Sequence, residues 1–497
     1  MIKSTDLIKL RDNFWLNFAV LFGTALLLVG KKPPFDNEYA YLLRLVKTYD
    51  ANFLLNDATF SAPANEHWVF NHLFGLLTFV FSIEFISWSG RVICWTILLF
   101  ALIRLGKYWE IPLWTITASI FLWLCSGQAI IGSEWIIGTF EAKCVAYICL
   151  LFALDGFCRE KLIYPAILLG LSFSFHPAVG MWGILAAGAA LLICRRSIPE
   201  LFKIGIITAL FALPGLLPLL TETAQPASFE DWKFIALVRL PTHFNPFSWS
   251  KSSIVLLYLQ LAFCLLFYRN GAATKERKFL TGFLSVLCLF FTAGIFLRAF
   301  EQYQLLQYMP MRLFPVFVLL FFFFTLAKAW EQKMFAPPLK AIALVGFLCL
   351  LLLQNPLSTA FDQLAENYKT WTTSPDDAAK TFIWLHENTP NGTTVIAPPW
   401  RKDFWYLARR AEILHDGYPP FSALSDWRKR LEILTGESPP EKGRRENEEI
   451  SAFYDSLTTE QINEIAARYQ AQYLVSESEY PFSAVFTSGK YKVYRLY

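Results

Sequence analysis

The chain has 497 residues, of which 55% are hydrophobic and only 17% are charged, and it contains 47 Phe and 17 Trp. A soluble protein of this length carries about 25% charged residues, so the composition excludes an ordinary soluble globular protein. The net charge of +4 is small and comes from Lys and Arg that flank apolar segments, which gives no case for a nucleic-acid partner. Charge is sparse up to residue 355 and dense afterwards. This shift predicts a membrane region followed by a separate soluble region.

Eleven apolar segments predict transmembrane helices, since about 20 mostly apolar residues in a helix cross a bilayer. They cover residues 13–30, 86–103, 111–126, 142–157, 162–177, 179–194, 202–221, 252–268, 279–297, 313–328 and 339–354. A further apolar segment, 68–82, is short, and a span there would place Arg104 and Lys107 outside the cell. We therefore expect residues 68–82 to lie on the outer leaflet or dip into it.

The basic residues decide the orientation, because short cytoplasmic loops carry the excess of Lys and Arg. Lys3, Lys9 and Arg11 place the N-terminus in the cytoplasm, and each later basic cluster then falls on the same side. The soluble C-terminal region is expected on the opposite side, in the periplasm of a bacterium. The predicted organisation is a membrane domain over 1–356, with outer loops at 31–85, 127–141, 222–251 and 298–312, and a periplasmic domain over 357–497.

The C-terminal region alternates helical and strand patterns, which predicts a small α/β domain. Helices are expected at 376–388, 422–435, 446–456 and 459–470, and short strands at 393–397, 411–414, 472–476, 484–487 and 491–496. The predicted fold is therefore an α-helical polytopic membrane protein with a C-terminal extracytoplasmic α/β domain.

Carboxylates gather in the first two predicted outer loops, and ionisable residues at a membrane edge tend to mark functional sites. Asp36 and Glu38 follow the first helix, while Glu134 and Glu141 lie in the second loop, with Lys143 just beyond it. Simpler interpretations exist for both groups. Asp36 would cap a helix over residues 37–48, and Glu141 would form a structural ion pair with Lys143.

Three arginines lie on the side of the membrane where positive charge is disfavoured: Arg239, Arg298 and Arg312. Anchoring to lipid headgroups explains one of them well and three less well. Arg matches the geometry of phosphate, so we expect these residues to bind an anion. His243 and His176 are further candidates for substrate binding, although His176 could instead bond to backbone groups freed beside Pro177.

The chain resembles the GT-C superfamily of membrane glycosyltransferases. The likeness rests on the acidic stretch Asp36-Asn37-Glu38-Tyr39 outside the first helix, on Arg91 early in the second helix and on the acidic second loop. The chain is also similar to a group of bacterial GT-C-like proteins in three stretches: Phe140-Glu141-Ala142-Lys143, His176-Pro177-Ala178-Val179-Gly180 and Trp384-Leu385-His386-Glu387-Asn388-Thr389-Pro390.

Two departures from GT-C enzymes bear on the site. Many of these enzymes have adjacent acids where this chain has Asn37 between Asp36 and Glu38, so either acid is a candidate for the base. The C-terminal region also lacks the Trp-Trp-Asp motif of oligosaccharyltransferases, so transfer to asparagine is not indicated.

The resemblance implies an inverting glycosyltransferase that moves a hexosyl or pentosyl group from a polyprenyl-phosphate-linked donor to a lipid, glycan or protein acceptor. The reaction would occur on the outer face of the bacterial cytoplasmic membrane. Asp36 would act as general base, and Glu134 and Glu141 would orient hydroxyls or hold a divalent cation together with Asp36. The cation is optional, because the sequence shows no cage of metal ligands.

Two alternatives need the same membrane architecture. A non-catalytic membrane partner in envelope polysaccharide assembly would not need Asp36. A transporter or flippase for lipid-linked sugars would need repeat symmetry and charge at mid-membrane, and the sequence shows little of either.

Overall fold

The computed structural model describes residues 11–221, 227–270, 274–331, 356–436 and 446–497. Contacts divide the chain into two compact units. Unit 1 consists of Met1–Lys32, Trp88–Pro218 and Leu240–Trp371, and unit 2 consists of Pro33–Ser87, Leu219–Arg239 and Thr372–Tyr497.

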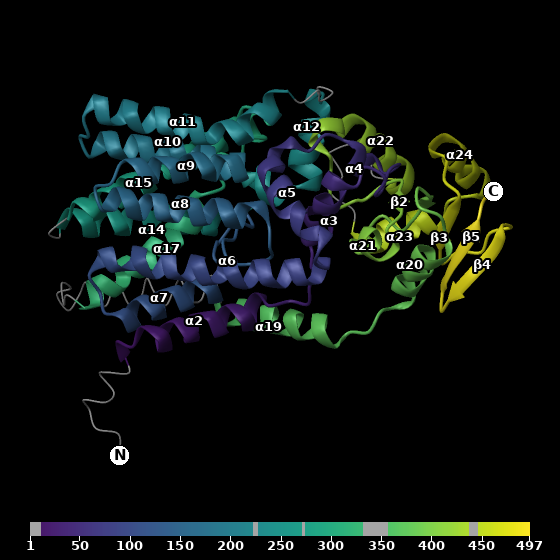
Figure 1. Cartoon of the computed structure of the whole chain (residues 1–497), viewed down its shortest axis with the longest axis horizontal. Helices are drawn as coiled ribbons and strands as arrows, with labels where there is room; N and C mark the ends of the chain where they lie inside the picture. The colour runs from purple at the N-terminus through teal and green to yellow at the C-terminus, as the bar shows by residue number, and fades with distance from the viewer. Residues whose placement is uncertain (1–10, 222–226, 271–273, 332–355, 437–445) are drawn as a thin grey trace, which may run out of the picture. The chain divides into compact units, whose positions relative to one another are not determined.

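Unit 1 is built from long apolar helices that pack side by side (Figure 1). The helices are α2 (Phe14–Val29), α6 (Ile83–Gly106), α7 (Leu113–Cys125), α8 (Ala142–Cys158), α9 (Ile163–Phe175), α10 (Pro177–Ile193), α11 (Ile198–Leu220), α14 (Lys251–Asn270), α15 (Lys275–Ala299) and α17 (Phe314–Glu331). Each matches a predicted segment within a few residues. The eleventh predicted helix, 339–354, and the basic residues Lys3 and Lys9 lie outside the described residues.

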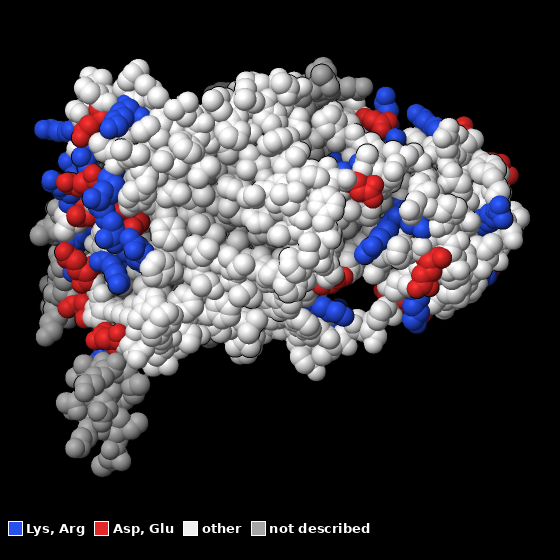
Figure 2. Space-filling model, in the orientation of Figure 1, with Lys and Arg blue, Asp and Glu red and all other residues white. Residues whose placement is uncertain are grey.

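The surface of unit 1 is that of a membrane protein. Within the described residues, α6, α11, α14, α15 and α17 are long and apolar enough to cross a bilayer, and α2, α7, α9 and α10 are shorter apolar helices. Charged side chains gather at one end of the helices, on the left of Figure 2, and the helix flanks that face the viewer show none. Ion pairs at this end include Glu160 with Lys275 at 3.1 Å and Asp155 with Arg159 at 3.0 Å. The chain is therefore a multi-pass membrane protein.

One long helix of unit 1 has no counterpart among the predicted elements. Helix α19 (Pro356–Thr372) packs along the C-terminal end of α2. Asn367 Nδ2 donates to the carbonyl of Leu27 at 2.7 Å, and Trp371 Nε1 donates to the carbonyl of Gly30 at 2.9 Å. The contacts thus group residues 357–371 with the membrane helices.

Unit 2 contains a five-stranded mixed sheet in the order β2-β1-β3-β5-β4. Strand β1 is parallel to β2 and β3, whereas β5 is antiparallel to β3 and β4. The strands are β1 (Thr394–Ile396), β2 (Ala411–Glu412), β3 (Tyr473–Ser476), β4 (Ser483–Ser488) and β5 (Tyr491–Arg495). The accompanying helices are α20 (Asp377–Asn388), α21 (Phe404–Ala408), α22 (Leu424–Thr435), α23 (Asn447–Asp455) and α24 (Thr459–Tyr469). The predicted α/β domain is confirmed.

Two segments from between the membrane helices complete unit 2. The first carries α3 (Glu38–Tyr49), α4 (Ala58–Ser61), α5 (Trp68–Gly75) and the short 3-10 helix η2 (Leu76–Phe79), and the second carries α12 (Phe229–Phe234). Asp57 joins the first segment to the sheet region, because its buried carboxylate accepts Trp405 Nε1 at 2.8 Å and the backbone N–H of Glu412 at 3.1 Å. In the second segment, Asp231 accepts the hydroxyl of Ser425 at 2.5 Å. Unit 2 is therefore assembled from three stretches of chain.

Candidate functional site

The loop between α7 and α8 is a rigid platform. Gln128 is buried, and its side chain accepts the N–H groups of Ile136 and Ile137 at 2.8 Å each and donates to the carbonyl of Ile137 at 2.6 Å. Trp95 Nε1 on α6 donates to the carbonyl of Gly138 at 2.7 Å. These bonds satisfy backbone groups that would otherwise be unpaired away from water, so the loop holds its acidic side chains in fixed positions.

An ionic cluster sits on this platform, and we name it the loop-end cluster: Glu134, Glu141, Lys143, Tyr147, His243 and Arg312. Glu134 is at its centre and is almost completely buried. Its carboxylate lies 2.8 Å from Arg312 Nε and accepts the hydroxyl of Tyr147 at 3.0 Å. Residues from the second and fourth predicted outer loops thus meet in unit 1.

Lys143 of the cluster lies at the start of α8. Its ammonium group is 3.7 Å from Glu141 and 3.4 Å from the ring centre of Trp135. Glu141 also accepts the hydroxyl of Thr139 at 2.7 Å. The expected Glu141–Lys143 ion pair is therefore present, with a cation–π contact beside it.

The charges of the cluster set the ionisation of two members. Burial alone would raise the pKa of Glu134, but the positive charges of Arg312 and Lys143 outweigh it, and the pKa lies below its ordinary value. Burial and the charge of Arg312 lower the pKa of His243 to about 4. At neutral pH Glu134 is thus an anion and His243 is uncharged.

The tautomer of His243 follows from its hydrogen bond. Its Nδ1 lies 3.0 Å from the carbonyl oxygen of Gly132, so Nδ1 carries the proton and Nε2 is a hydrogen-bond acceptor. The cluster therefore combines two cations, each paired with a carboxylate, and one neutral hydrogen-bond acceptor, which are groups that can bind a phosphate and a hydroxyl.

The other predicted residues of unit 1 have different surroundings. Arg298, at the end of α15, donates through Nε to Asn245 Oδ1 at 3.0 Å and stacks over Phe247 and Tyr303. His176 is the N-cap of α10, where its Nδ1 accepts the N–H of Val179 at 3.4 Å. His176 therefore has a structural role as a cap, and its predicted role in substrate binding stays a prediction.

Asp36 and Glu38 lie in unit 2 and differ sharply from each other. Glu38 is buried in the first turn of α3, and its carboxylate accepts the backbone N–H of Phe35 at 3.0 Å. Asp36 has a left-handed backbone with φ of 49°, a conformation uncommon for residues other than glycine. Its half-exposed carboxylate lies 2.5 Å from the ammonium group of Lys402. The N-cap of α3 is Asn37, so Asp36 does not hold the capping position.

Arg239 also belongs to unit 2, at the end of a π-helical turn over Ile235–Arg239. Its guanidinium is buried, forms an ion pair with Asp416 and donates to the carbonyl of Asp416 at 2.8 Å. It also faces the ring of Trp427. Arg239 thus joins its segment to the loop after β2, and its predicted role in phosphate binding stays a prediction.

Sequence reasoning missed the residues that support these groups. Gln128 and Tyr147 are polar residues in strongly apolar surroundings, and that signal could have singled them out. Lys402 and Asp416 carry no comparable signal, because they lie in a polar region and their partners are 366 and 177 residues away.

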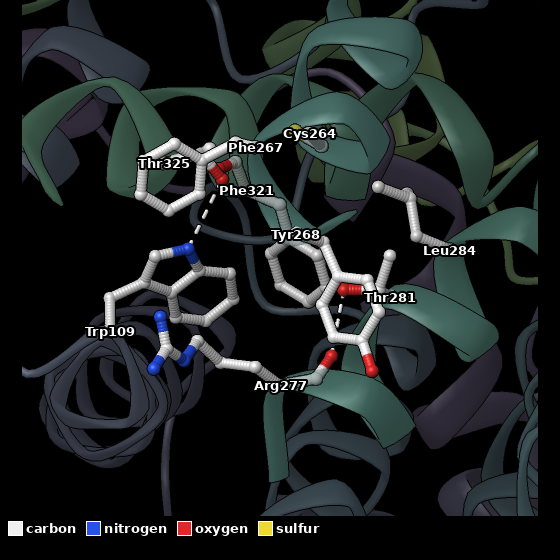
Figure 3. A pocket seen from close by; sticks show the side chains of 9 residues that line it. All are labelled: Trp109, Cys264, Phe267, Tyr268, Arg277, Thr281, Leu284, Phe321 and Thr325. Carbon is white, nitrogen blue, oxygen red and sulfur yellow. Dashed lines mark hydrogen bonds between the residues drawn. The ribbon is translucent and has the colours of Figure 1, made fainter. Parts of the chain in front are cut away.

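A cavity at the opposite end of unit 1 is not this site (Figure 3). Its volume of about 20 Å³ accommodates a single water molecule. Trp109 Nε1 donates to Thr325 at its edge, at 3.1 Å. It is lined by Trp109, Cys264, Phe267, Tyr268, Arg277, Thr281, Leu284, Phe321 and Thr325. Among the described residues, no group of three or more His, Cys, Asp or Glu is arranged to hold a metal ion.

No protein-family model matches the chain, and no curated protein sequence matches it. By contrast, solved structures match the chain in fold. The oligosaccharyltransferase of Archaeoglobus fulgidus, solved with zinc and sulfate, matches with a TM-score of 0.50 and 11% identity, over 93% of this chain and 67% of that one. The oligosaccharyltransferase AglB of the same organism, solved with an inhibitory peptide and a dolichol phosphate, matches with a TM-score of 0.50 and 12% identity, over 93% of this chain and 69% of that one. The chain has the GT-C fold.

A mycobacterial arabinofuranosyltransferase is also similar, with a TM-score of 0.48 and 14% identity, over 94% of this chain and 35% of that one. The expected resemblance in fold is confirmed by the archaeal structures. In this GT-C fold, the loop-end cluster lies where the helices of unit 1 meet their loops, and Asp36 lies just after the first membrane helix.

Proposed function

We propose that the protein is an inverting glycosyltransferase that takes a sugar from a polyprenyl-phosphate-type donor on the outer face of a bacterial cytoplasmic membrane. The observation that carries the proposal is the loop-end cluster, in which Lys143 and Arg312 are held by carboxylates beside the neutral acceptor His243. Arginine and lysine side chains held at a membrane edge suit the phosphate of a lipid carrier. The GT-C fold is the supporting analogy at the level of architecture.

The proposed reaction assigns roles to Asp36, Lys143 and Arg312. The acceptor oxygen forms a bond to the anomeric carbon of the sugar while its proton passes to the carboxylate of Asp36. The bond from the anomeric carbon to the phosphate oxygen breaks, and its electron pair leaves with the phosphate. Lys143 and Arg312 stabilise the charge that builds on the phosphate, and the configuration at the anomeric carbon inverts.

Asp36 is favoured over Glu38 as the base because of their surroundings. The carboxylate of Glu38 is buried and bonded to the backbone of Phe35, whereas that of Asp36 is half-exposed beside Lys402. A general base must reach the acceptor hydroxyl, and only Asp36 is accessible. The left-handed backbone at Asp36 adds support, since such strain is concentrated at functional sites.

Sugar transfer by purified, lipid-reconstituted protein tests the proposal. A panel of radiolabelled polyprenyl-phosphate sugars is compared for the wild type, Asp36→Asn and Glu38→Gln, with Glu460→Gln as a control on an exposed position of α24. We expect Asp36→Asn to lose about 10²–10⁴-fold in turnover, while Glu460→Gln keeps it.

Equal turnover by all four proteins would overturn the role of Asp36. A wild type that binds the donors without consuming any of them would favour the non-catalytic assembly partner instead.

A further inference from the structure

Two buried cations share one carboxylate near the start of α15 and the end of α17, and we name the three residues the helix-end triad: Arg277, Lys328 and Glu110. Arg277 Nη2 lies 3.5 Å from Oε2 of Glu110, and Lys328 Nζ lies 3.2 Å from the same atom. The side chains of Arg277 and Lys328 retain only 10% and 7% of their accessible surface, whereas that of Glu110 retains 56%. The cations are therefore held inside unit 1, and their shared counter-ion reaches them from the exposed side.

Glu110 has an uncommon backbone conformation. Its φ of 51° lies in the left-handed region, which residues other than glycine rarely adopt. It follows the short 3-10 helix η3 (Lys107–Trp109) and turns its backbone carbonyl as well as its carboxylate to Lys328, at 3.1 Å and 3.2 Å. Backbone strain of this kind is concentrated at functional sites. Two acceptors of a buried lysine thus come from one exposed and strained residue.

The charges of the helix-end triad do not balance, because two cations face one carboxylate. Helix α15 adds to the positive potential, since Arg277 is its third residue and the N-terminal end of a helix carries a partial positive charge. A basic residue is disfavoured at such a position unless an anion lies close to it. The surroundings of Arg277 and Lys328 therefore favour a further anion.

The small cavity in Figure 3 limits where a ligand can approach. Arg277 borders it together with Tyr268 and Thr281, and the Thr281 hydroxyl donates to the carbonyl of Arg277 at 2.7 Å. Because the cavity accommodates a single water molecule, a larger ligand cannot enter through it. The accessible approach to the cations is the one that the exposed side chain of Glu110 occupies.

We propose that the helix-end triad binds a phosphate group, which displaces the carboxylate of Glu110 from Arg277 and Lys328. The planar fork of a guanidinium and the ammonium group of a lysine both suit phosphate oxygens. The phosphate belongs either to the headgroup of an anionic lipid or to a soluble phosphate. The proposal does not depend on glycosyl transfer.

Lipid binding by the full-length protein in detergent provides the first test. Native mass spectrometry measures the dissociation constant of phosphatidylglycerol, and phosphatidylcholine, whose headgroup has no net charge, is the reference lipid. The proteins compared are the wild type, Arg277→Gln, Lys328→Gln and Glu110→Gln. The matched control is Lys278→Gln, which removes an exposed cation next to Arg277 on α15.

We expect Arg277→Gln and Lys328→Gln to bind phosphatidylglycerol about tenfold or more weakly than the wild type, and Lys278→Gln to bind it equally well. Glu110→Gln should bind it more tightly, because the competing carboxylate is gone. This gain separates the proposal from a purely structural ion pair, whose loss would lower stability without raising the affinity for an anion. Two cation variants guard against the misfolding of one of them.

A second arm replaces the lipid with inorganic phosphate and measures the shift of the thermal unfolding midpoint, relative to chloride at equal ionic strength. If only the lipid affinity depends on the variants, the ligand is a headgroup; if only the phosphate shift does, the ligand is soluble phosphate. Dependence in both arms would mean that the site accepts phosphate from either source. Equal behaviour of the wild type, Arg277→Gln and Glu110→Gln in both arms would overturn the proposal.

Discussion

The two units reach a stable structure by different routes. The helices of unit 1 can each be predicted from local sequence, because each is an apolar stretch long enough to fill most of a bilayer. Unit 2 depends on side chains that meet from distant parts of the chain, such as Asp57 with Trp405 and Asp231 with Ser425. Local hydropathy therefore describes unit 1 well, whereas unit 2 needs its full set of long-range contacts.

The largest expected effect is on the stability of unit 2, where Asp57 joins the segment after the first membrane helix to the sheet region. In Asp57→Ala, the N–H groups of Trp405 and Glu412 lose their acceptor inside the protein, as do those of Thr59 and Phe60. Each buried donor left unpaired costs about 1–3 kcal/mol, so we expect a loss of more than about 3 kcal/mol. Hydrogen exchange of unit 2 measures this loss.

The control for Asp57→Ala is Glu448→Ala, an exposed acid on α23, which should change stability by less than about 1 kcal/mol. If the two substitutions have similar effects, the contacts at Asp57 do not hold unit 2 together. If Asp57→Ala speeds hydrogen exchange only in the strands of the sheet, and not in the other segments of unit 2, that result would also argue against a unit made of three segments.

A second prediction concerns the loop-end cluster of unit 1. Arg312→Gln removes a cation proposed to stabilise the leaving phosphate, so turnover should fall by about 10²–10³-fold. It also leaves Glu134 without its ion-pair partner, so stability falls too. The double variant Arg312→Gln with Glu134→Gln should recover stability without recovering turnover. Recovery of both would make the pair purely structural.

The third prediction concerns how the stability of unit 2 depends on pH. Burial raises the pKa of Glu412 well above its ordinary value, and the charge of Asp57 raises it further. Burial lowers the pKa of His415 to about 3. Folded unit 2 thus keeps a proton on Glu412 that the unfolded chain releases as pH rises above 4.5. In folded unit 2, His415 also stays uncharged as pH falls below 6.5, whereas the same residue binds a proton in the unfolded chain.

Glu412 therefore lowers the stability of unit 2 as pH rises above 4.5, and His415 lowers it as pH falls below 6.5. Each effect is at most about 1.4 kcal/mol per pH unit. Glu412→Gln should stabilise unit 2 increasingly as pH rises above 4.5, and His415→Gln should stabilise it as pH falls below 6.5. Thermal unfolding monitored by hydrogen exchange at several pH values provides the measurement. A Glu412→Gln variant that is less stable than the wild type at pH 8 would contradict this account.

The smallest expected effect lies inside the helices of unit 1. Gln260 on α14 is buried, and neither atom of its amide has a hydrogen-bond partner among the described residues. Gln260→Leu should raise the free energy of unfolding by up to about 1 kcal/mol, since it removes a polar group that nothing satisfies. Thermal denaturation in detergent would detect the change. A lower midpoint for the variant would imply that the amide has a function.

The sequence predicts much of the secondary structure and less of the site. The helix expected at 142–157 is found at Ala142–Cys158, and the strand expected at 491–496 at Tyr491–Arg495. Both patterns are local, as apolar length and alternation are properties of neighbouring residues. Helix α19 was not predicted, because its polar composition hides the face that packs on α2.

The candidate site was only partly predictable for the same reason. Glu134, Glu141 and Lys143 were visible because charge is rare in an apolar loop. The partnership of Glu134 with Arg312, like that of Asp36 with Lys402, spans more than 170 residues. No local pattern encodes such a pair. The different surroundings of Asp36 and Glu38 likewise emerge only when the chain is folded.

The central claim is that the loop-end cluster of unit 1 binds the phosphate of a lipid-linked sugar donor. The most direct test is the binding of a radiolabelled polyprenyl-phosphate sugar to full-length, reconstituted protein, compared for the wild type, Lys143→Gln and Lys275→Gln, a lysine outside the cluster that pairs with Glu160. We expect Lys143→Gln to bind the donor more weakly, because it removes a cation of the cluster, and Lys275→Gln to bind it as the wild type does. Equal donor affinity of Lys143→Gln and the wild type would contradict the account.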